Sequence, residues 1–309
     1  MIVRAPGKLV LSGAYAVLEG APAVVAAVDR YAYADARIAA TWVTPEVRAA
    51  LGDRAPSFDA SELRGGPHKL GLGSSAAILV ASLLADALEA EDAPDWNRLR
   101  DAVFATALQA HRAAQGGGSG LDVAASCYGG VLVYRLASDG PVIARGSLPS
   151  GLVVQAWDTG TPASTAELLK RVRAFSDSCP AAFREHMSAQ SAAATLAADA
   201  LQDGNVRAWL QGVVAQHEAL LELGRASGAP IVTEGMAQLH RLAHSNNAAV
   251  LPSGAGGGDV FLYYGTSGPT AAWLQAAEDL GYRTVALTLG AEGASAVAAP
   301  SVSAATARS

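Results

Sequence analysis

A short glycine-rich segment with two serines is the part of this chain best suited to chemistry. It consists of Gly71, Leu72, Gly73, Ser74, Ser75 and Ala76, and it is followed by an apolar run from Ile78 to Ala90 that predicts a helix. Backbone N–H groups at the positive end of a helix bind anions, and serine hydroxyls can add a magnesium ligand. The segment has neither the Walker A spacing nor the third glycine of a dinucleotide fingerprint. The sequence therefore predicts either a phosphate-binding loop or a tight turn capped by serine.

Three further glycine clusters accompany this loop. Residues 5–18 contain Pro-Gly-Lys, residues 115–126 contain Gly-Ser-Gly-Leu-Asp-Val-Ala-Ala, and residues 252–259 contain Ser-Gly-Ala-Gly-Gly-Gly-Asp. In this order, and over about residues 1–289, the set resembles the GHMP kinases, a superfamily that includes galactokinase, homoserine kinase and mevalonate kinase. Within that superfamily, the last two clusters are most similar to those of phosphomevalonate kinases.

The resemblance implies a two-domain fold of the α+β class. We expect an N-terminal α+β domain over residues 1–150, a C-terminal ferredoxin-like α/β-plait domain over 151–290, and a disordered tail over 291–309. The predicted elements agree with this class, because they contain no regular βαβ repeat. Predicted strands cover residues 2–10, 23–28, 31–34, 130–135, 141–145, 152–157, 248–251, 260–264 and 284–289. Predicted helices cover residues 46–51, 75–91, 95–115, 164–175, 180–202, 206–227, 233–243 and 270–280.

The composition fits a compact cytosolic enzyme. Of the 309 residues, 51% are hydrophobic, which supplies an ample core. The net charge of −6 and the lack of a basic run argue against nucleic-acid binding, and no run is long and apolar enough to span a bilayer. Two cysteines do not make a disulfide framework, which favours a reducing compartment. We expect a cytoplasmic monomer or homodimer.

For the phosphoryl donor, the resemblance implies ATP with Mg²⁺. Ser74 and Ser75 are then expected at the β- and γ-phosphates, with Ser75 as the metal ligand and the backbone of residues 71–76 around the nucleotide. Lys69 matches a family lysine that would stabilise the transferring charge, and we count it among the catalytic residues. As an isolated loop residue it would instead be solvated.

For the phosphoryl acceptor, the resemblance implies residues from distant parts of the chain. Lys8 would contact the acceptor and the transferred group, because the transition state needs a cation there. Ser164 and Thr165 match family positions near the acceptor, but they would equally serve as capping residues of a helix. The expected substrate-binding set is Lys8, Tyr15, Ser119, Gly120, Asp122, Ser164, Thr165, Gly254, Ala255, Gly256 and Gly257.

Asp122 has several possible roles. Its small neighbours let a substrate approach closely. With an alcohol acceptor such as mevalonate, it would be the base that takes the proton. A phosphate monoester has a second pKa of about 6 and is largely deprotonated at neutral pH, so phosphomevalonate hardly needs a base. Asp122 would then orient Lys8 or bind magnesium. A turn or N-cap aspartate is the purely structural alternative.

Three features depart from the family pattern. The family usually has a glutamate at the position of Ala14 and a lysine at that of Leu251, and residues 32–70 form a shorter span than in phosphomevalonate kinases. Glu19 and Asp29 are candidates to supply the missing acidic group. Five histidines lack metal-ligand spacing, and we predict them at the surface: His111, His186, His217, His240 and His244.

The predicted function is ATP-dependent phosphorylation of 5-phosphomevalonate to 5-diphosphomevalonate. One alternative keeps the kinase chemistry with mevalonate as the acceptor. Another is the related ATP-dependent decarboxylase of phosphorylated mevalonates. The third is a catalytically weakened homologue with a binding or regulatory role, which the alanine at position 14 and the short span suggest.

Overall fold

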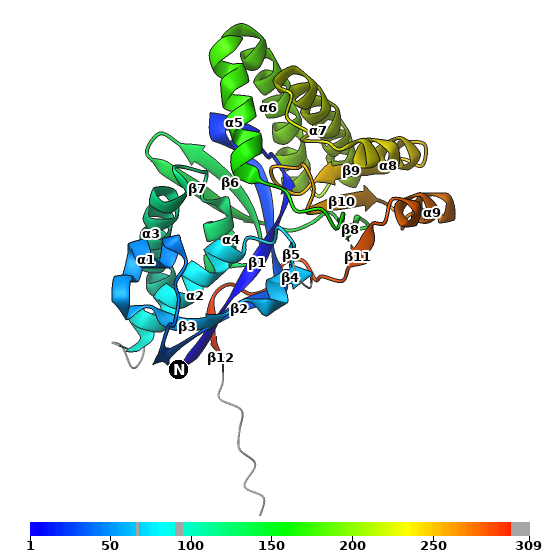
Figure 1. Ribbon diagram of the computed structural model, residues 1–309. Helices are drawn as coiled ribbons and strands as arrows, with labels where there is room; N and C mark the ends of the chain where they lie inside the picture. The colour runs from blue at the N-terminus through cyan, green and yellow to red at the C-terminus, as the bar shows by residue number, and fades with distance from the viewer. Residues whose placement is uncertain (66–67, 90–94, 298–309) are drawn as a thin grey trace, which may run out of the picture.

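Two antiparallel sheets with helices packed against them make up the protein. The computed structural model describes residues 1–65, 68–89 and 95–297. The first sheet and its helices form the lower half of Figure 1, and the second sheet with its long helices forms the upper right. The main apolar core runs through both halves, with Leu9 and Leu79 fully buried in one and Trp209 and Trp273 in the other.

The first sheet is built around one long hairpin, β1 and β2. The strand order is β12-β1-β2-β6-β7, with β3 also paired to β2. The predicted strands at 23–28 and 31–34 are a single strand, because β2 bends past the irregularity at Pro6/Gly7 of β1 and keeps pairing. The strands are β1 (Ile2–Ser12), β2 (Ala23–Ala39), β3 (Pro56–Asp59), β6 (Val131–Ala137), β7 (Gly140–Gly146) and β12 (Ser295–Val297).

Helices α2 and α4 pack against this first sheet, and α1 and α3 pack against these helices and each other. Their bounds are α1 (Pro45–Leu51), α2 (Ser74–Glu89), α3 (Trp96–Gln115) and α4 (Leu121–Tyr128). The alanine-rich sequence of α2 suits its place, because small side chains let the helix lie close to β1 and β2. Helix α4 was not predicted. It begins at Gly120, whose left-handed backbone (φ +82°) starts the helix without a side-chain cap.

The second sheet has the order β11-β8-β10-β9 with every neighbouring pair antiparallel. Four helices lie between β8 and β9 in the chain and one between β10 and β11, which is the βαββαβ succession of a ferredoxin-like plait and confirms the predicted class. The strands are β8 (Val153–Asp158), β9 (Ala249–Pro252), β10 (Val260–Gly265) and β11 (Arg283–Val285). The helices are α5 (Thr165–Ser178), α6 (Pro180–Gln202), α7 (Val206–Ser227), α8 (Glu234–His244) and α9 (Ala271–Asp279).

The prediction of a disordered tail from residue 291 is wrong for residues 291–297. Gly130 donates its N–H to Ala291 O at 2.8 Å, and β12 then pairs with β1, Ile2 facing Val297. An open strand edge on β1 thus outweighs the alanine-rich composition of this segment. Residues 298–309 lie outside the described residues. We propose domain boundaries at 1–150 and 151–290, with β12 completing the first domain.

Short elements complete the description. They are the 3₁₀ turns η1 (Ala16–Glu19), η2 (Gly52–Arg54) and η3 (Ser61–Leu63), and a small hairpin of β4 (Arg64–Gly65) and β5 (His68–Lys69) that leads into the glycine loop. Among the described helices, none combines the length and the apolar character needed to cross a membrane.

Candidate active site

Lys8 is the point at which the glycine-rich clusters meet. It stands in the middle of β1 with only 8% of its surface exposed. Its Nζ donates to Gly71 O at 2.9 Å, and its stem passes so close to Gly73 that a methyl group there would lie 3.0 Å from Lys8 Cγ. A methyl group on Gly254 would lie 4.0 Å from Nζ. The cluster that contains Lys8, the glycine loop and the cluster at residues 252–259 therefore meet around one ammonium group.

Two opposing effects act on the charge of Lys8. Burial lowers its pKa, while the nearby carboxylates of Asp122 and Asp259 act in the opposite direction. An ammonium group has three hydrogens, and Gly71 O takes one of them. Since no other described residue accepts a hydrogen bond from Nζ, two N–H groups are left for an anionic ligand in front of the glycine loop.

The glycine loop ends where α2 begins, as predicted. Gly71 and Gly73 have positive φ angles of 68° and 75°, which turn the chain sharply into the helix. The first helical hydrogen bond comes from Ala77 N to Gly73 O at 3.1 Å. The amides of Ser74 and Ser75 therefore belong to the unpaired first turn, whose partial positive charge attracts phosphate.

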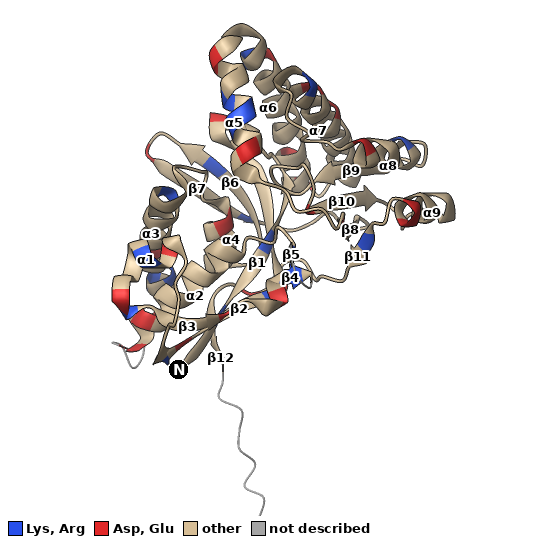
Figure 2. Cartoon of the chain, in the orientation of Figure 1, with Lys and Arg blue, Asp and Glu red and all other residues tan. Residues whose placement is uncertain are grey.

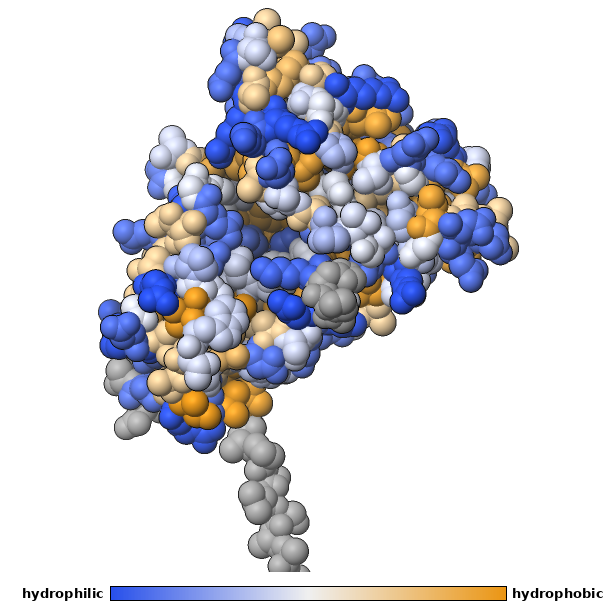
Figure 3. Space-filling model, in the orientation of Figure 1, coloured by the Kyte–Doolittle hydropathy of each residue, from blue (hydrophilic) through white to orange (hydrophobic). Residues whose placement is uncertain are grey.

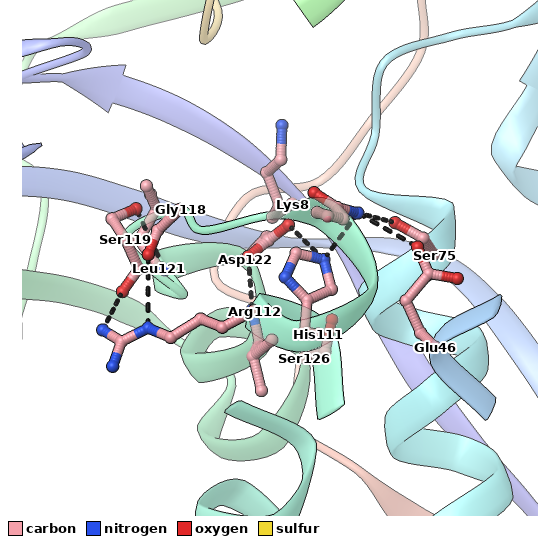
Figure 4. A network of polar contacts seen from close by, with 12 residues as sticks. Lys8, Glu46, Ser75, His111, Arg112, Gly118, Ser119, Leu121, Asp122 and Ser126 are labelled. Atoms are coloured by element: carbon pink, nitrogen blue, oxygen red, sulfur yellow. Dashed lines mark hydrogen bonds and ion pairs between the residues drawn. The ribbon is translucent and has the colours of Figure 1, made fainter. Parts of the chain in front are cut away.

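Asp122 lies on the other side of Lys8, in the first turn of α4. Its Oδ1 accepts from Val123 N at 3.0 Å, and its Oδ2 lies 3.4 Å from His111 Nε2. The side chain is 22% exposed, so the carboxylate still reaches the surface. It does not cap the helix, because Gly120 occupies that position without a side-chain bond. Figure 4 shows Asp122 between the Lys8 side chain and the His111 ring.

Ser119 and Gly120 hold the turn before Asp122. The Ser119 carbonyl accepts from Arg112 Nη2 at 3.2 Å and also from the Tyr134 hydroxyl. A methyl group on Gly120 would collide with Leu108 Cδ1. Ser119 Oγ accepts a long bond from Leu121 N (3.4 Å), and the side chain is 7% exposed. These contacts rigidify the turn that carries Asp122.

The last cluster divides into a part facing the site and a part facing the protein. Gly254 and Ala255 lie toward Lys8 and Tyr15, respectively. Gly256 faces the other way, since a methyl group on it would collide with Ile231 O, and Gly257 packs beside Leu168. The predicted substrate contact of these two glycines stays a prediction. Their conformational freedom serves the turn itself.

Two side chains brace this arrangement. The buried Tyr15 hydroxyl donates to Ala255 O at 2.7 Å, and burial raises its pKa. Asp259 Oδ1 accepts from Ala163 N at 3.1 Å, and a methyl group on Gly71 would lie 2.9 Å from Asp259 Oδ2. Tyr15 therefore links the first cluster to the last, while Asp259 links the last cluster to the glycine loop and the entry of α5.

Three predicted site residues are exposed and make few contacts. Lys69 is exposed on β5, two residues before Gly71. Ser164 is the N-cap of α5, with Oγ accepting from Glu167 N at 3.3 Å, and Thr165 is the exposed first residue of that helix. The capping role is therefore realised for Ser164. Their contact with substrate stays a prediction.

The reasoning from sequence missed a buried polar group behind the glycine loop. Glu46, in the first turn of α1, is 7% exposed, and Gln115, at the end of α3, donates from Nε2 to Glu46 Oε1 at 3.1 Å. The same Nε2 lies 3.2 Å from Ser75 Oγ and 3.0 Å from His111 Nε2. Hydrogen bonds from Gln115 and Thr44 lower the pKa of Glu46 against the effect of burial, which keeps it ionised. In the sequence, the Gln-Gly run that begins at Gln115 is the one feature that points to this part of the site.

The prediction that all five histidines lie at the surface is wrong for three of them. His111 is 3% exposed, His217 2% and His240 7%. The rings of His217 and His240 stack at 3.6 Å between centroids, and each has Nδ1 near Val250 O. Packing of α7 and α8 against β9 buries this pair, and no local signal marks it.

The departures from the family pattern have mixed consequences. Ala14 is buried, and Leu251 is 2% exposed in the core of the second sheet. Glu19 is exposed, and Asp29 accepts from Thr288 N at 2.6 Å. By contrast, Glu46 comes from the shortened span itself and approaches Ser75 through Gln115.

The site opens into a hollow between the two halves of the molecule, visible at the centre of Figure 3 with mostly hydrophilic residues around it. Figure 2 shows basic residues on α5, beside this hollow. Arg173 on α5 is exposed, and a methyl group on Gly117 would lie 3.9 Å from its Nη2. Within the described ranges, no three His, Cys, Asp or Glu side chains gather closely enough to hold a metal ion by themselves.

Comparison with known proteins agrees with this geometry. Residues 40–130 match the sequence profile described as GHMP kinases N terminal domain. The chain carries a GHMP kinase N-terminal domain. This GHMP kinase domain contains the glycine loop and Asp122.

The relatives are named as kinases of two mevalonate-pathway substrates. The phosphomevalonate kinase of Streptomyces sp. (strain CL190) is 29% identical, over 84% of this chain and 88% of the relative. The mevalonate kinase of Archaeoglobus fulgidus is 28% identical, over 92% of this chain and 99% of the relative. The crystal structure of Streptococcus pneumoniae phosphomevalonate kinase in complex with phosphomevalonate and AMPPNP has the same fold, with a TM-score of 0.73, 19% identity, and coverage of 94% of this chain and 99% of that one.

Proposed function

We propose that this protein transfers the γ-phosphoryl group of ATP to 5-phosphomevalonate, forming 5-diphosphomevalonate. The observation that carries this proposal is the position of Lys8, whose ammonium group lies between the glycine loop, Gly254 and Asp122. Phosphoryl transfer depends mainly on positioning and on stabilising the charge of the transferred group. A buried cation in front of a helix N-terminus supplies that stabilisation.

The first turn of α2 would hold the phosphates of ATP through the amides and hydroxyls of Ser74 and Ser75. The nearby groups also fit Mg²⁺, which prefers hard oxygen ligands and binds through one or two carboxylates, phosphates and waters. Ser75 Oγ would be a ligand, and the ionised Glu46 lies across one amide nitrogen from it. The metal, when bound, would offset charge on the donor phosphates. The two free N–H groups of Lys8 would bind the transferring phosphoryl oxygens.

Two observations support a phosphorylated acceptor. Both Asp122 oxygens face other groups, Val123 N and His111 Nε2, which suits an ionised group that orients Lys8 better than a base that must take a proton. Arg173 lies near Gly117 and forms no ion pair with any described residue, so its guanidinium is available for the acceptor phosphate.

A mevalonate kinase is the second candidate. The Archaeoglobus fulgidus mevalonate kinase matches the chain almost as well as the Streptomyces phosphomevalonate kinase does. Asp122 is partly exposed beside Lys8, where a base for an alcohol would be needed.

We further propose a cytosolic enzyme, because the two cysteines are free. We propose that it is a monomer or a homodimer.

The test is a coupled ADP-release assay with Mg-ATP and, separately, mevalonate, phosphomevalonate and diphosphomevalonate. We expect turnover with phosphomevalonate and formation of the diphosphate. Turnover of mevalonate alone would assign the second candidate, and release of CO₂ would assign a decarboxylase. Binding of nucleotide without any turnover would identify a non-catalytic homologue and refute the proposal.

A further inference from the structure

A chain of polar groups, of which Glu46 and His111 are buried, joins the two sides of the site through the side chain of His111. Figure 4 shows the His111 ring in the middle of this chain, with Asp122 and Lys8 on one side and Ser75 and Glu46 on the other. The contacts are His111 Nε2 to Asp122 Oδ2 at 3.4 Å and to Gln115 Nε2 at 3.0 Å. All of them lie on α1 to α4, inside the first domain.

Counting hydrogens assigns the direction of each bond. The Gln115 amide nitrogen has two hydrogens but three neighbours, namely Glu46 Oε1, Ser75 Oγ and His111 Nε2. If His111 Nε2 carries a hydrogen, it donates to Asp122, and Gln115 gives one hydrogen each to Glu46 and Ser75. If Nε2 is bare, its lone pair faces the carboxylate, and Gln115 can no longer serve all three neighbours. The first arrangement leaves no acceptor in the chain without a donor, and the Gln115 and His111 nitrogens then touch without a hydrogen bond between them.

The other ring nitrogen supports the same assignment. His111 Nδ1 is buried and has no hydrogen-bond partner. A hydrogen on Nδ1 would be a buried donor without an acceptor, which costs about 1–3 kcal/mol. A hydrogen on Nε2 alone, directed at Asp122, avoids this cost.

We propose that His111 is a positioning residue, which holds the Asp122 carboxylate toward Lys8, and that Gln115 ties this pair to Ser75 of the donor loop. With Val123 N on Oδ1 and His111 on Oδ2, Asp122 has both oxygens fixed. Glu46 anchors the far end of the chain. This arrangement couples the acceptor side of the site to the phosphate side. The kinetic part of the inference rests on the proposed phosphoryl transfer.

The first test needs no turnover. Long-range ¹H–¹⁵N spectra of the protein labelled at its six histidines report which ring nitrogen carries hydrogen. His111 is assigned by the signal lost in His111→Gln. We expect the neutral Nε2–H form at neutral pH and a clear shift of that resonance in Asp122→Ala. An Nδ1–H form, an imidazolium, or a resonance unmoved by Asp122→Ala would overturn the proposal.

The second test separates positioning from simple structural support. His111→Leu removes the donor, whereas the amide of His111→Gln can still donate to Asp122. We expect kcat to fall about 10- to 100-fold in the leucine variant, as for other residues that orient a functional group, with a much smaller change in KM for ATP. The glutamine variant should recover most of this loss. The exposed His244→Gln serves as the matched control.

A double-mutant cycle tests whether His111 acts through Asp122. If His111 acts through Asp122, then adding His111→Leu to Asp122→Asn should cost little more than Asp122→Asn alone. Additive losses, or equal losses in the leucine and glutamine variants, would mean that His111 only supports the fold. If the wild type turns over none of the three acceptors, the proposed function fails, and the spectra alone decide whether His111 holds Asp122.

Discussion

Replacing Lys8 by methionine is expected to remove most of the activity and leave the fold intact. The Lys8 side chain is 8% exposed and gives one of its three hydrogens to Gly71 O. Two N–H groups therefore remain to bind the transferring phosphoryl oxygens. Loss of one preorganised donor to a transition state costs roughly 2.7–4 kcal/mol, about 10²- to 10³-fold in kcat. KM should change less, because the charge develops mainly during transfer.

The stability of the Lys8→Met variant follows from two opposing effects. Burial lowers the pKa of Lys8 more than Asp122 and Asp259 raise it, so the fold disfavours the cation, and methionine relieves this cost. Methionine also loses the bond to Gly71 O, worth about 1.5–3 kcal/mol for a charged donor. We expect the two to cancel to within about 1–2 kcal/mol. Because the folded pKa lies below the unfolded one, wild-type stability also rises with pH through that window, and this rise should be absent in the variant.

The assay is steady-state ADP release with Mg-ATP and phosphomevalonate, together with urea unfolding. Lys170→Met, an exposed lysine on α5, is the control for loss of one positive charge. The reasoning is refuted if Lys8→Met retains kcat within a factor of about three, or if its stability falls enough to explain the lost activity.

Four further outcomes test other parts of the structure. Ser75→Ala should lower kcat by roughly 10²-fold with an unchanged melting temperature, because the half-buried hydroxyl accepts only from Gln115 among the described residues. With phosphomevalonate as the acceptor, Asp122→Asn should lower the rate by less than the roughly 10²- to 10⁴-fold that is typical of losing a general base. A loss within that range in pre-steady-state rates would favour an alcohol acceptor. Burial lowers the pKa of His217 to about 3, far below the unfolded value of about 6.5. The free energy of unfolding should therefore decrease as the pH falls between these two values, and it should decrease less in His217→Leu. Equal pH slopes of the two proteins in urea titrations would contradict this. Gly256→Ala should destabilise by about 1–3 kcal/mol through collision with Ile231 O, measured against Gly228→Ala, where φ is also positive and no atom lies within 4 Å.

The parts of the site that could be predicted are those that depend on residues close to one another in the sequence. Ser74 and Ser75 sit at a helix start because glycines precede them and an apolar run follows, and Pro-Gly-Lys marks Lys8 as a constrained position. Glu46 could not be found in this way. Its partner Gln115 is 69 positions away, and the two meet only because α1 packs against α3. The short span of residues 32–70 thus supplies the buried carboxylate of Glu46.

The wrong predictions have a similar origin. His217 and His240 look like ordinary polar residues on amphipathic helices, yet both turn toward Val250 O in a buried strand. The segment after residue 291 has the small-residue composition of a tail, but pairing with the edge of β1 outweighs composition. In each case a long-range partner decided the outcome, and local pattern carries no information about such partners.

The pairing of β12 with β1 also has a consequence for synthesis of the chain. Arg4 and Ser295 hydrogen-bond across a separation of 291 positions, so the first strand made waits for almost the last one described. At typical translation rates of 5–20 residues per second, this wait lasts roughly 15–60 s. During that time one edge of β1 has no partner on the nascent chain, and every described element of the second domain is synthesised before β12. The first domain is therefore the later of the two to be completed, and its open edge is the place where a stalled or truncated chain would recruit another strand.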